Sequence, residues 1–185
     1  EFLPNTYDQY YLYPDYKVSH LDPNFTRADE VMAGREKRVF TECAEVIKEG
    51  KLGDKFHAIS DAHAEMMIKV AEAIAYNKND RHILIVENNG AIANMQDDAM
   101  VEVVCELGIN GPRPMRVGNI PQFNLGLLVN QVSCEKLIVD AYFENSYQKA
   151  LEAFTLNRLI NDAKKARKVL DALIEANKGM WPELR

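Results

Sequence analysis

Apolar residues recur every three or four positions over most of this chain, which is the period of an amphipathic α-helix. The first such stretch follows Thr26, a residue type that often precedes a helix, and Asp29 stands three positions later as in a variant of the capping box. Gly50 closes the stretch, and glycine ends many helices. The pattern therefore predicts one long helix over residues 27–49.

The same period predicts four more helices. One is capped by Ser60 and runs through Tyr76. The face of this helix that we expect to be buried consists of Met66, Met67, Ile68, Ala71 and Ala75. The other three helices follow Pro121, a residue suited to a helix start, and lie within residues 122–144, 146–157 and 162–179.

Two apolar runs have the composition of strands. Residues 81–90, "RHILIVENNG", predict a buried strand that an Asn-Asn-Gly turn stops, and residues 99–108, "AMVEVVCELG", predict a second strand that pairs with the first. Residues 109–121 are so rich in Gly and Pro that we expect a shaped loop. The fold class predicted is α+β, helix-dominated, with a small sheet, as one domain over residues 1–185.

Composition excludes several classes of protein. With 185 residues, 47% hydrophobic and 27% charged, the chain is long enough for one well-buried core. No apolar run is long enough to span a membrane, and a net charge of −6 argues against binding nucleic acid. We expect a small-molecule or protein partner. The cysteines are odd in number and lack C-x-x-C spacing, which predicts reduced thiols in a cytoplasmic protein.

Five of the eight tyrosines lie in residues 5–16, "NTYDQYYLYPDY". A tyrosine taken out of water must find a partner for its hydroxyl, so this cluster indicates an interface, a wet pocket or an active site. No G-x-G-x-x-G, P-loop, H-E-x-x-H or G-x-S-x-G motif accompanies it. Because the sequence begins without Met in what reads as structured sequence, we expect a fragment.

Five blocks in order along the chain carry a resemblance to a known family. They are "LPNTYDQYYLYPDY", "NFTRADEVMAGRE", "ILIVENNGAIANMQDDAMVEV", "GINGPRPMRVGNIP" and "NKGMWPEL". Together, over residues 3–184, they resemble the C-terminal half of family 4 glycoside hydrolases, most closely the 6-phospho-α-glucosidase branch. The resemblance implies a C-terminal domain like that of lactate and malate dehydrogenases. It also implies an N-terminal Rossmann domain, which is absent from this sequence.

The resemblance implies a glycosidase chemistry without the usual pair of carboxylates. In this family NAD takes a hydride from C3 of the sugar, a base removes the C2 proton, the aglycone leaves by elimination, and then water adds and the hydride returns. A divalent metal, usually Mn²⁺, bridges the sugar hydroxyls. We expect NAD and Mn²⁺ to be bound mainly by the missing N-terminal half, and the substrate to be a phosphorylated disaccharide.

Tyr7 aligns with the tyrosine that removes the C2 proton in this family. A phenol in water ionises only near pH 10, so such a base needs positive charge nearby, from a metal or an arginine. The alternative is that Tyr7 only packs, as every tyrosine of the cluster could. We leave Tyr10, Tyr11, Tyr13 and Tyr16 as packing or subunit-contact residues.

Arg27 lies in the first turn of the long predicted helix, where the helix dipole disfavours a cation. Its guanidinium, the helix amides and Thr26 could together bind one anion, and the resemblance implies the 6-phosphate of the substrate. The alternative is a surface ion pair with Asp29 or Glu30. Asn88 and Asn89 are predicted substrate contacts on the same basis, against the alternative of a tight turn that needs positive φ angles.

Three other functions remain open at this stage. The chain could be a self-association domain that uses its Tyr segment and C-terminal helices, inactive by itself and forming a homo-oligomer. It could belong to another family 4 enzyme, a 6-phospho-β-glucosidase or an α-galactosidase. The C-terminal domain of a 2-hydroxy-acid dehydrogenase is disfavoured, because such enzymes place a catalytic histidine in this half and none of the four here lies in a recognisable motif.

Overall fold

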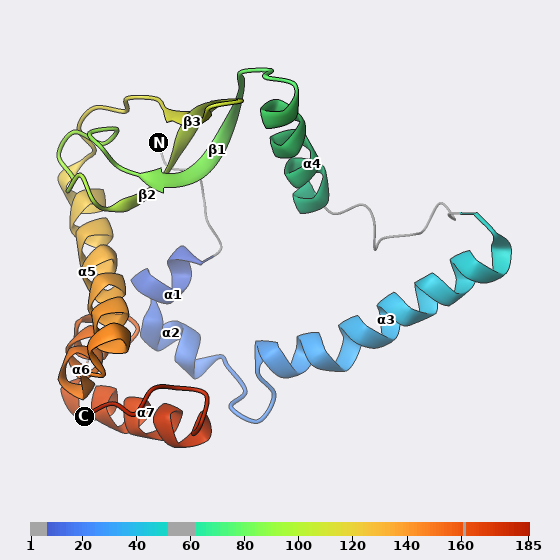
Figure 1. Cartoon of the computed structure of the whole chain (residues 1–185). Coiled ribbons are helices and arrows are strands. Elements are labelled where there is room, and N and C mark those ends of the chain that lie inside the picture. Colours follow the sequence, from blue (N-terminus) through green and yellow to red (C-terminus); the bar gives the residue numbers. More distant parts are fainter. Residues whose placement is uncertain (1–6, 52–61, 161) are drawn as a thin grey trace. The chain divides into compact units, whose positions relative to one another are not determined.

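The computed structural model describes residues 7–51, 62–160 and 162–185 (Figure 1). Its elements are α1 (Asp8–Leu12), α2 (Pro14–Ser19), α3 (Arg27–Glu49), α4 (Ala62–Ala75), β1 (Asp80–Glu87), β2 (Met100–Gly108), β3 (Gly111–Pro114), α5 (Gln122–Glu144), α6 (Tyr147–Leu156) and α7 (Ala163–Ala176). They fall into two compact units. One contains α1, Ile83–Cys105 and Arg113–Arg185, and the other contains Tyr13–His82 and Glu106–Pro112.

The sheet is small and antiparallel, with strand order β1-β2-β3. β2 is the central strand, and its residues alternate between exposed and buried positions. β1 also alternates, so that Leu84 and Val86 pack against the core while Ile83 and Ile85 are exposed. The predicted pairing of the two strands is confirmed, but β1 is buried on one face only.

The prediction of a loop over residues 109–121 is wrong in part, because Gly111–Pro114 form the strand β3. Pro112 and Pro114 lack a backbone N–H, which is tolerated where a strand lies at the edge of a sheet. β3 is such an edge strand. Gly111 begins it with a φ of +86°, a left-handed value that suits glycine at a tight turn.

Two clusters of buried side chains form the core of the unit that contains α5. The larger joins β1, β2, the 88–99 loop and the first half of α5. Its buried members are Ala91, Ile92, Met95, Ala99, Val101, Val103, Cys105 and Val132. The smaller lies among the C-terminal helices, around the buried residues Ala141, Ala150 and Leu170. The apolar faces predicted for these helices therefore do pack against one another.

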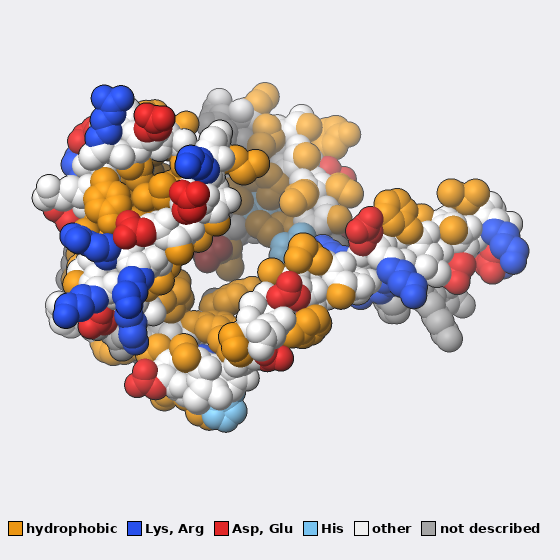
Figure 2. Space-filling model, turned by 90° about the horizontal axis from the view of Figure 1, so that it is seen from below, with side chains coloured by type: hydrophobic (Ala, Val, Ile, Leu, Met, Phe, Trp, Pro, Cys, Tyr) orange, Lys and Arg blue, Asp and Glu red, His pale blue; other side chains and the backbone are white. Residues whose placement is uncertain are grey.

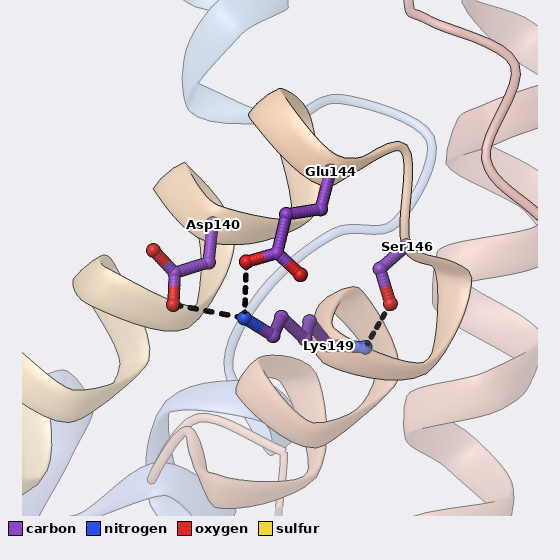
Figure 3. Close-up of polar contacts among 4 residues, drawn as sticks. All are labelled: Asp140, Glu144, Ser146 and Lys149. Carbon is purple, nitrogen blue, oxygen red and sulfur yellow. Dashed lines mark hydrogen bonds and ion pairs between the residues drawn. The ribbon is translucent and has the colours of Figure 1, made fainter.

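Polar contacts fix the junction between α5 and α6 (Figure 3). Asn145 ends α5 in the left-handed conformation, and the hydroxyl of Ser146 accepts a hydrogen bond from the backbone N–H of Lys149. The Lys149 ammonium lies 2.6 Å from Glu144 and 3.2 Å from Asp140. The hydrogen bond to Glu144, followed by that to Asp140, raises the pKa of Lys149.

The long helix α3 has the bounds that the sequence predicts, and it begins with the predicted capping box. Thr26 Oγ1 accepts from the backbone N–H of Asp29, and the Asp29 carboxylate accepts from the backbone N–H of Thr26 at 2.8 Å. Gly50 ends the helix with a φ of +66°. No residue of α3 is buried by any part of the chain that the structure describes.

The buried face predicted for α4 is wrong for this chain. Met66, Met67 and Ile68 are exposed, and within α4 only Ala73 is buried among the side chains that the structure describes. The 3.6-residue period reports that a helix is amphipathic, but not which partner covers its apolar face. The predicted cap Ser60 lies outside the described residues. None of the described helices combines the length and the apolar character of a membrane span.

Candidate functional site

Tyr7 stands in a turn just before the short helix α1, and its side chain is 68% exposed. The carbonyl of Tyr7 accepts a hydrogen bond from the backbone N–H of Tyr10 at 3.0 Å, and the two rings are tilted with centroids 6.3 Å apart. The side chain of Tyr7 is therefore not sealed in the apolar core. A phenol sealed in the apolar core would be unable to act as a base.

Arg27 is the first residue of α3, and its guanidinium donates to Glu30 with an Nη1–Oε2 distance of 2.6 Å. Both side chains are exposed. The surface ion pair that the sequence offered as an alternative is thus present. An exposed pair of this kind contributes between 0 and about 1 kcal/mol. The pair with Glu30 therefore holds Arg27 only weakly.

The Thr26 hydroxyl is already engaged in the helix cap. It donates to Asp29 Oδ2 at 2.7 Å, and this bond lowers the pKa of Asp29, with the backbone bond from Thr26 as the second cause. An anion would have to displace Asp29 to use this hydroxyl. Of the predicted anion-binding group, Arg27 itself remains the best candidate.

Asn88 is completely buried at the end of β1, and its side chain holds the loop that follows. Its Oδ1 accepts from the backbone N–H of Ile92 at 2.7 Å. Its Nδ2 lies within hydrogen-bond distance of three carbonyl oxygens, those of Ile92, Met95 and Gln96, at 3.0 to 3.2 Å. The amide is thus fully used inside the chain, which favours a structural role. Its contact with substrate stays a prediction.

Asn89 has the opposite environment although it is the next residue. It is exposed, it has a φ of +41°, and its Nδ2 donates to Glu87 at 3.1 Å. Gly90 follows with a φ of +79°. The positive φ angles expected of a tight turn are present, and the side chain of Asn89 still points to a surface where a ligand could reach it.

Asn94 joins two loops by hydrogen bonds, and the sequence analysis did not identify it. Its Nδ2 donates to the carbonyl of Ile120, and its Oδ1 accepts from the backbone N–H of Ile120, both at 3.0 Å. Ile92 and Gly118 form a parallel bridge beside this contact. The 88–99 loop and the 115–121 loop are therefore joined side by side. An Asn-rich turn in the sequence is a weak signal for this contact, because Ile120 lies 26 positions away from Asn94.

The four residues predicted to act at the site lie at three separate positions in the fold. Asn88 and Asn89 share one turn, and Tyr7 belongs to the same compact unit, whereas Arg27 belongs to the other unit. Among the described residues, no three His, Cys, Asp or Glu side chains are grouped so that they could hold a metal ion. The described part of the chain therefore shows no group of this kind, and the roles of Tyr7, Arg27, Asn88 and Asn89 stay predictions.

Comparison with known proteins defines the class. Residues 1–160 match the Family 4 glycosyl hydrolase C-terminal domain, and the chain belongs to this family. It is 52% identical over 183 residues to maltose-6'-phosphate glucosidase MalH of Clostridium acetobutylicum, covering 98% of this chain and 41% of that protein. The family resemblance and the α+β fold class predicted from the sequence are confirmed.

Solved structures show the same fold. A 6-phospho-α-glucosidase from gut microorganisms in complex with NAD and Mn²⁺ is 82% identical, with a TM-score of 0.91 over 100% of this chain and 42% of its own. A second, in complex with NAD and glucose-6-phosphate, is 49% identical, with a TM-score of 0.90 over 99% of this chain and 41% of its own.

A more distant relative is a β-glucosidase, in contrast to the α-glucosidases above. The 6-phospho-β-glucosidase BglT of Thermotoga maritima is 28% identical over 180 residues, covering 95% of this chain and 42% of that enzyme. The chain spans about two fifths of the length of all these relatives.

Proposed function

We propose that this chain is the substrate-side, C-terminal domain of a 6-phospho-α-glucosidase that hydrolyses phosphorylated disaccharides and depends on NAD and a divalent metal. The observation that carries the proposal is the difference in identity between the two branches of the family. It is 52% to MalH and 28% to the 6-phospho-β-glucosidase BglT, over nearly the same residues. For a 6-phospho-β-glucosidase we would expect the identity to BglT to be the higher of the two, and for a third specificity we would expect the two identities to be similar.

NAD and Mn²⁺ come to this proposal from a relative that is 82% identical and was solved with both. When bound, they supply hydride acceptance at the sugar C3 and polarisation of the sugar oxygens. The described residues contain no group of three His, Cys, Asp or Glu side chains that could hold a metal ion. A preceding nucleotide-binding half would hold both, and this chain would add the proton acceptor and the phosphate contact.

In this proposal Tyr7 accepts the proton from C2 of the sugar. Support comes from the exposure of the Tyr7 side chain, because a base that meets a substrate cannot be sealed in the core. General-base catalysis by a phenol requires positive charge nearby, which the rest of the assembled enzyme would supply. Removal of the C2 proton then lets the aglycone leave by elimination.

Arg27 binds the 6-phosphate of the sugar in this proposal. The guanidinium fork matches a phosphate, and charge-assisted hydrogen bonds of this kind are stronger than an exposed ion pair. Support comes from the exposure of Arg27 and from a relative solved with glucose-6-phosphate. Of the two asparagines, Asn89 has the accessible side chain, so we assign it the substrate contact and assign Asn88 to holding the loop.

We further propose a cytoplasmic homo-oligomer. The thiols of Cys43, Cys105 and Cys134 are all unpaired, as expected in a reducing compartment. Burial raises the pKa of the Cys105 thiol, which keeps it in its unreactive protonated form.

The test uses the full-length protein that carries this chain, supplied with NAD and Mn²⁺. Initial rates are measured on p-nitrophenyl 6-phospho-α-glucoside, its β-anomer and the unphosphorylated α-glucoside. The proposal predicts the highest kcat/KM for the phosphorylated α-glucoside. A preference for the β-anomer would overturn the assignment to this branch, and equal rates without the phosphate would overturn the substrate class. The 185-residue chain alone is expected to hydrolyse none of them.

A further inference from the structure

The sequence contains two Asn-Gly pairs, and both lie in turns at the surface. Asn89 and Gly90 follow β1, and Asn110 and Gly111 lie where β2 passes into β3. Both asparagines are exposed, and a Cβ added at either glycine would meet no described atom within 4 Å. In such a pair the backbone nitrogen of the glycine can approach the asparagine side chain, because no Cβ obstructs it. Neither exposure nor crowding separates the two pairs, so a difference between them must come from their hydrogen bonds.

The turn at Asn89 is held closed by hydrogen bonds. Asn89 and Gly90 have φ angles of +41° and +79°, and the N–H of Ala91 donates to the carbonyl oxygen three residues earlier at 2.7 Å. Positive φ at both central residues is typical of a tight hairpin turn. The backbone N–H of Asn89 donates to the carbonyl of Asp97 at 2.9 Å, and its Nδ2 donates to Glu87 at 3.1 Å. The Gly90 nitrogen can therefore reach the Asn89 side chain only after such bonds open.

The turn at Asn110 leaves the asparagine side chain unbonded within the described part of the chain. Asn77 Oδ1 accepts a hydrogen bond from the backbone N–H of Ile109 at 3.0 Å, and a Cβ at Gly108 would lie 2.7 Å from the same oxygen. These contacts hold the end of β2. The side chain of Asn110 itself forms no hydrogen bond with any residue that the structure describes. Rotation of this side chain toward the Gly111 nitrogen therefore breaks no hydrogen bond of the side chain.

We propose that Asn110 is a modification site, a thermolabile amide that is lost spontaneously with water as the co-reactant. The backbone nitrogen of Gly111 attacks Cγ of Asn110, so that an N–Cγ bond forms, the Cγ–Nδ2 bond breaks, and ammonia leaves with the proton of the Gly111 N–H. Water then opens the cyclic imide at either of its carbonyl carbons. Opening at Cγ gives aspartate, and opening at the backbone carbonyl carbon gives isoaspartate, in which the main chain runs through Cγ. Nothing is oxidised or reduced.

The product differs from the parent chain in charge and, in the isoaspartate form, in its backbone. Acidic and basic side chains are intermixed on the face in Figure 2, and the net charge of the chain is −6. The new carboxylate adds one negative charge and makes the net charge −7. Isoaspartate also lengthens the main chain between β2 and β3 by the atom Cβ. Because β3 is an edge strand, we expect the pairing of β1 with β2 to persist.

The test compares the folded full-length protein that carries this chain with the same protein unfolded in guanidinium chloride, both incubated at mildly alkaline pH. Cleavage after glutamate gives the fragments 88–102 and 107–135, each with one Asn-Gly pair, and mass spectrometry follows the deamidation of each pair. In the unfolded protein we expect similar rates. In the folded protein we expect Asn110 to react about tenfold or more faster than Asn89, because the bonds of the Asn89 turn must open first. Circular dichroism checks that the folded sample stays folded.

Two controls accompany this comparison. Asn119 lies in the same fragment as Asn110 and is also exposed, but Ile120 follows it, so it should react much more slowly than Asn110. Asn110→Gln keeps the amide but requires a larger ring for the attack, so it should abolish deamidation at residue 110. Transfer of a labelled methyl group from S-adenosylmethionine by an isoaspartate methyltransferase should label fragment 107–135 of the aged wild type and not that of Asn110→Gln.

Three results would each overturn the proposal. The first is an Asn110 that does not react in the folded protein, which would mean that the turn is covered or held rigid in the longer chain. The second is a ratio of the Asn110 rate to the Asn89 rate that is no higher in the folded protein than in the unfolded protein. The third is an Asn119 that reacts as fast as Asn110, because exposure alone would then explain the reaction.

Discussion

Asn88 and Ile92 hydrogen-bond each other twice: the Asn88 Oδ1 accepts from the Ile92 N–H at 2.7 Å, and the Asn88 Nδ2 lies 3.0 Å from the Ile92 carbonyl oxygen. Because Asn88 is completely buried, no water can replace these bonds. We expect Asn88→Asp to lower the free energy of unfolding by about 3 kcal/mol or more, since a carboxylate would face carbonyl oxygens. Urea denaturation measures this loss.

The neighbouring Asn89→Gly is the matched control for that experiment. Its left-handed φ suits glycine, and its one side-chain bond is exposed, so its stability should stay within about 0.5 kcal/mol of the wild type. Equal losses for the two variants would mean that the turn as a whole matters and that the Asn88 network does not.

Tyr147 links α6 to α7 through its hydroxyl, which donates to Asp171 Oδ1 at 2.7 Å. This hydrogen bond, with burial second, raises the pKa of Tyr147. Its contribution to stability is therefore complete below the unfolded-state value of about 10 and is lost as the pH rises through the raised pKa. We expect Tyr147→Phe to be less stable than the wild type by about 0.5–1.5 kcal/mol at pH 8.

Urea titrations from pH 8 to pH 11 measure this difference between Tyr147→Phe and the wild type, which should shrink above about pH 10. The control is Tyr142→Phe, at an exposed position on α5, which should match the wild type at every pH. A difference for Tyr147→Phe that is constant with pH would show that ring packing, and not the bond to Asp171, is responsible.

Arg27→Ala in the full-length enzyme should raise KM for a phosphorylated substrate about 10- to 100-fold, the range expected when charge-assisted hydrogen bonds to phosphate are lost. The kcat should change little, because the phosphate is remote from the reacting bond. Arg27→Lys keeps the positive charge but lacks the guanidinium fork, so its KM should lie between those of the wild type and Arg27→Ala. Steady-state kinetics on an unphosphorylated analogue is the control, and an equal KM increase there would contradict a phosphate contact.

Local signals predicted much of the fold. The bounds of α3 follow from Thr26, Asp29 and Gly50, because capping bonds join residues only a few positions apart. The three C-terminal helices follow from their apolar period, and the caps Ser146 and Asp162 that the structure shows were not identified from the sequence. Capping bonds and the apolar period both depend on residues that lie close together in the sequence.

The features that the sequence missed depend on distant partners. β3 contains two prolines, which a strand tolerates at the edge of a sheet. Its edge position depends on pairing with β2, and a local sequence pattern does not show that pairing. The exposed faces of α3 and α4 have the pattern of buried faces, because period does not specify what covers a helix. At the candidate site, Asn88 and Asn89 are the same residue type side by side. Only the path of the 88–99 loop makes one buried and the other exposed.

The proposed role of Tyr7 is tested most directly by Tyr7→Phe in the full-length enzyme with NAD, Mn²⁺ and a 6-phospho-α-glucoside, followed as turnover and as exchange of the C2 hydrogen with deuterium from the solvent. The account predicts that both fall by at least about a thousandfold, the upper range for loss of a general base, while KM and NAD binding stay near wild-type values. Wild-type turnover and exchange in Tyr7→Phe would contradict it.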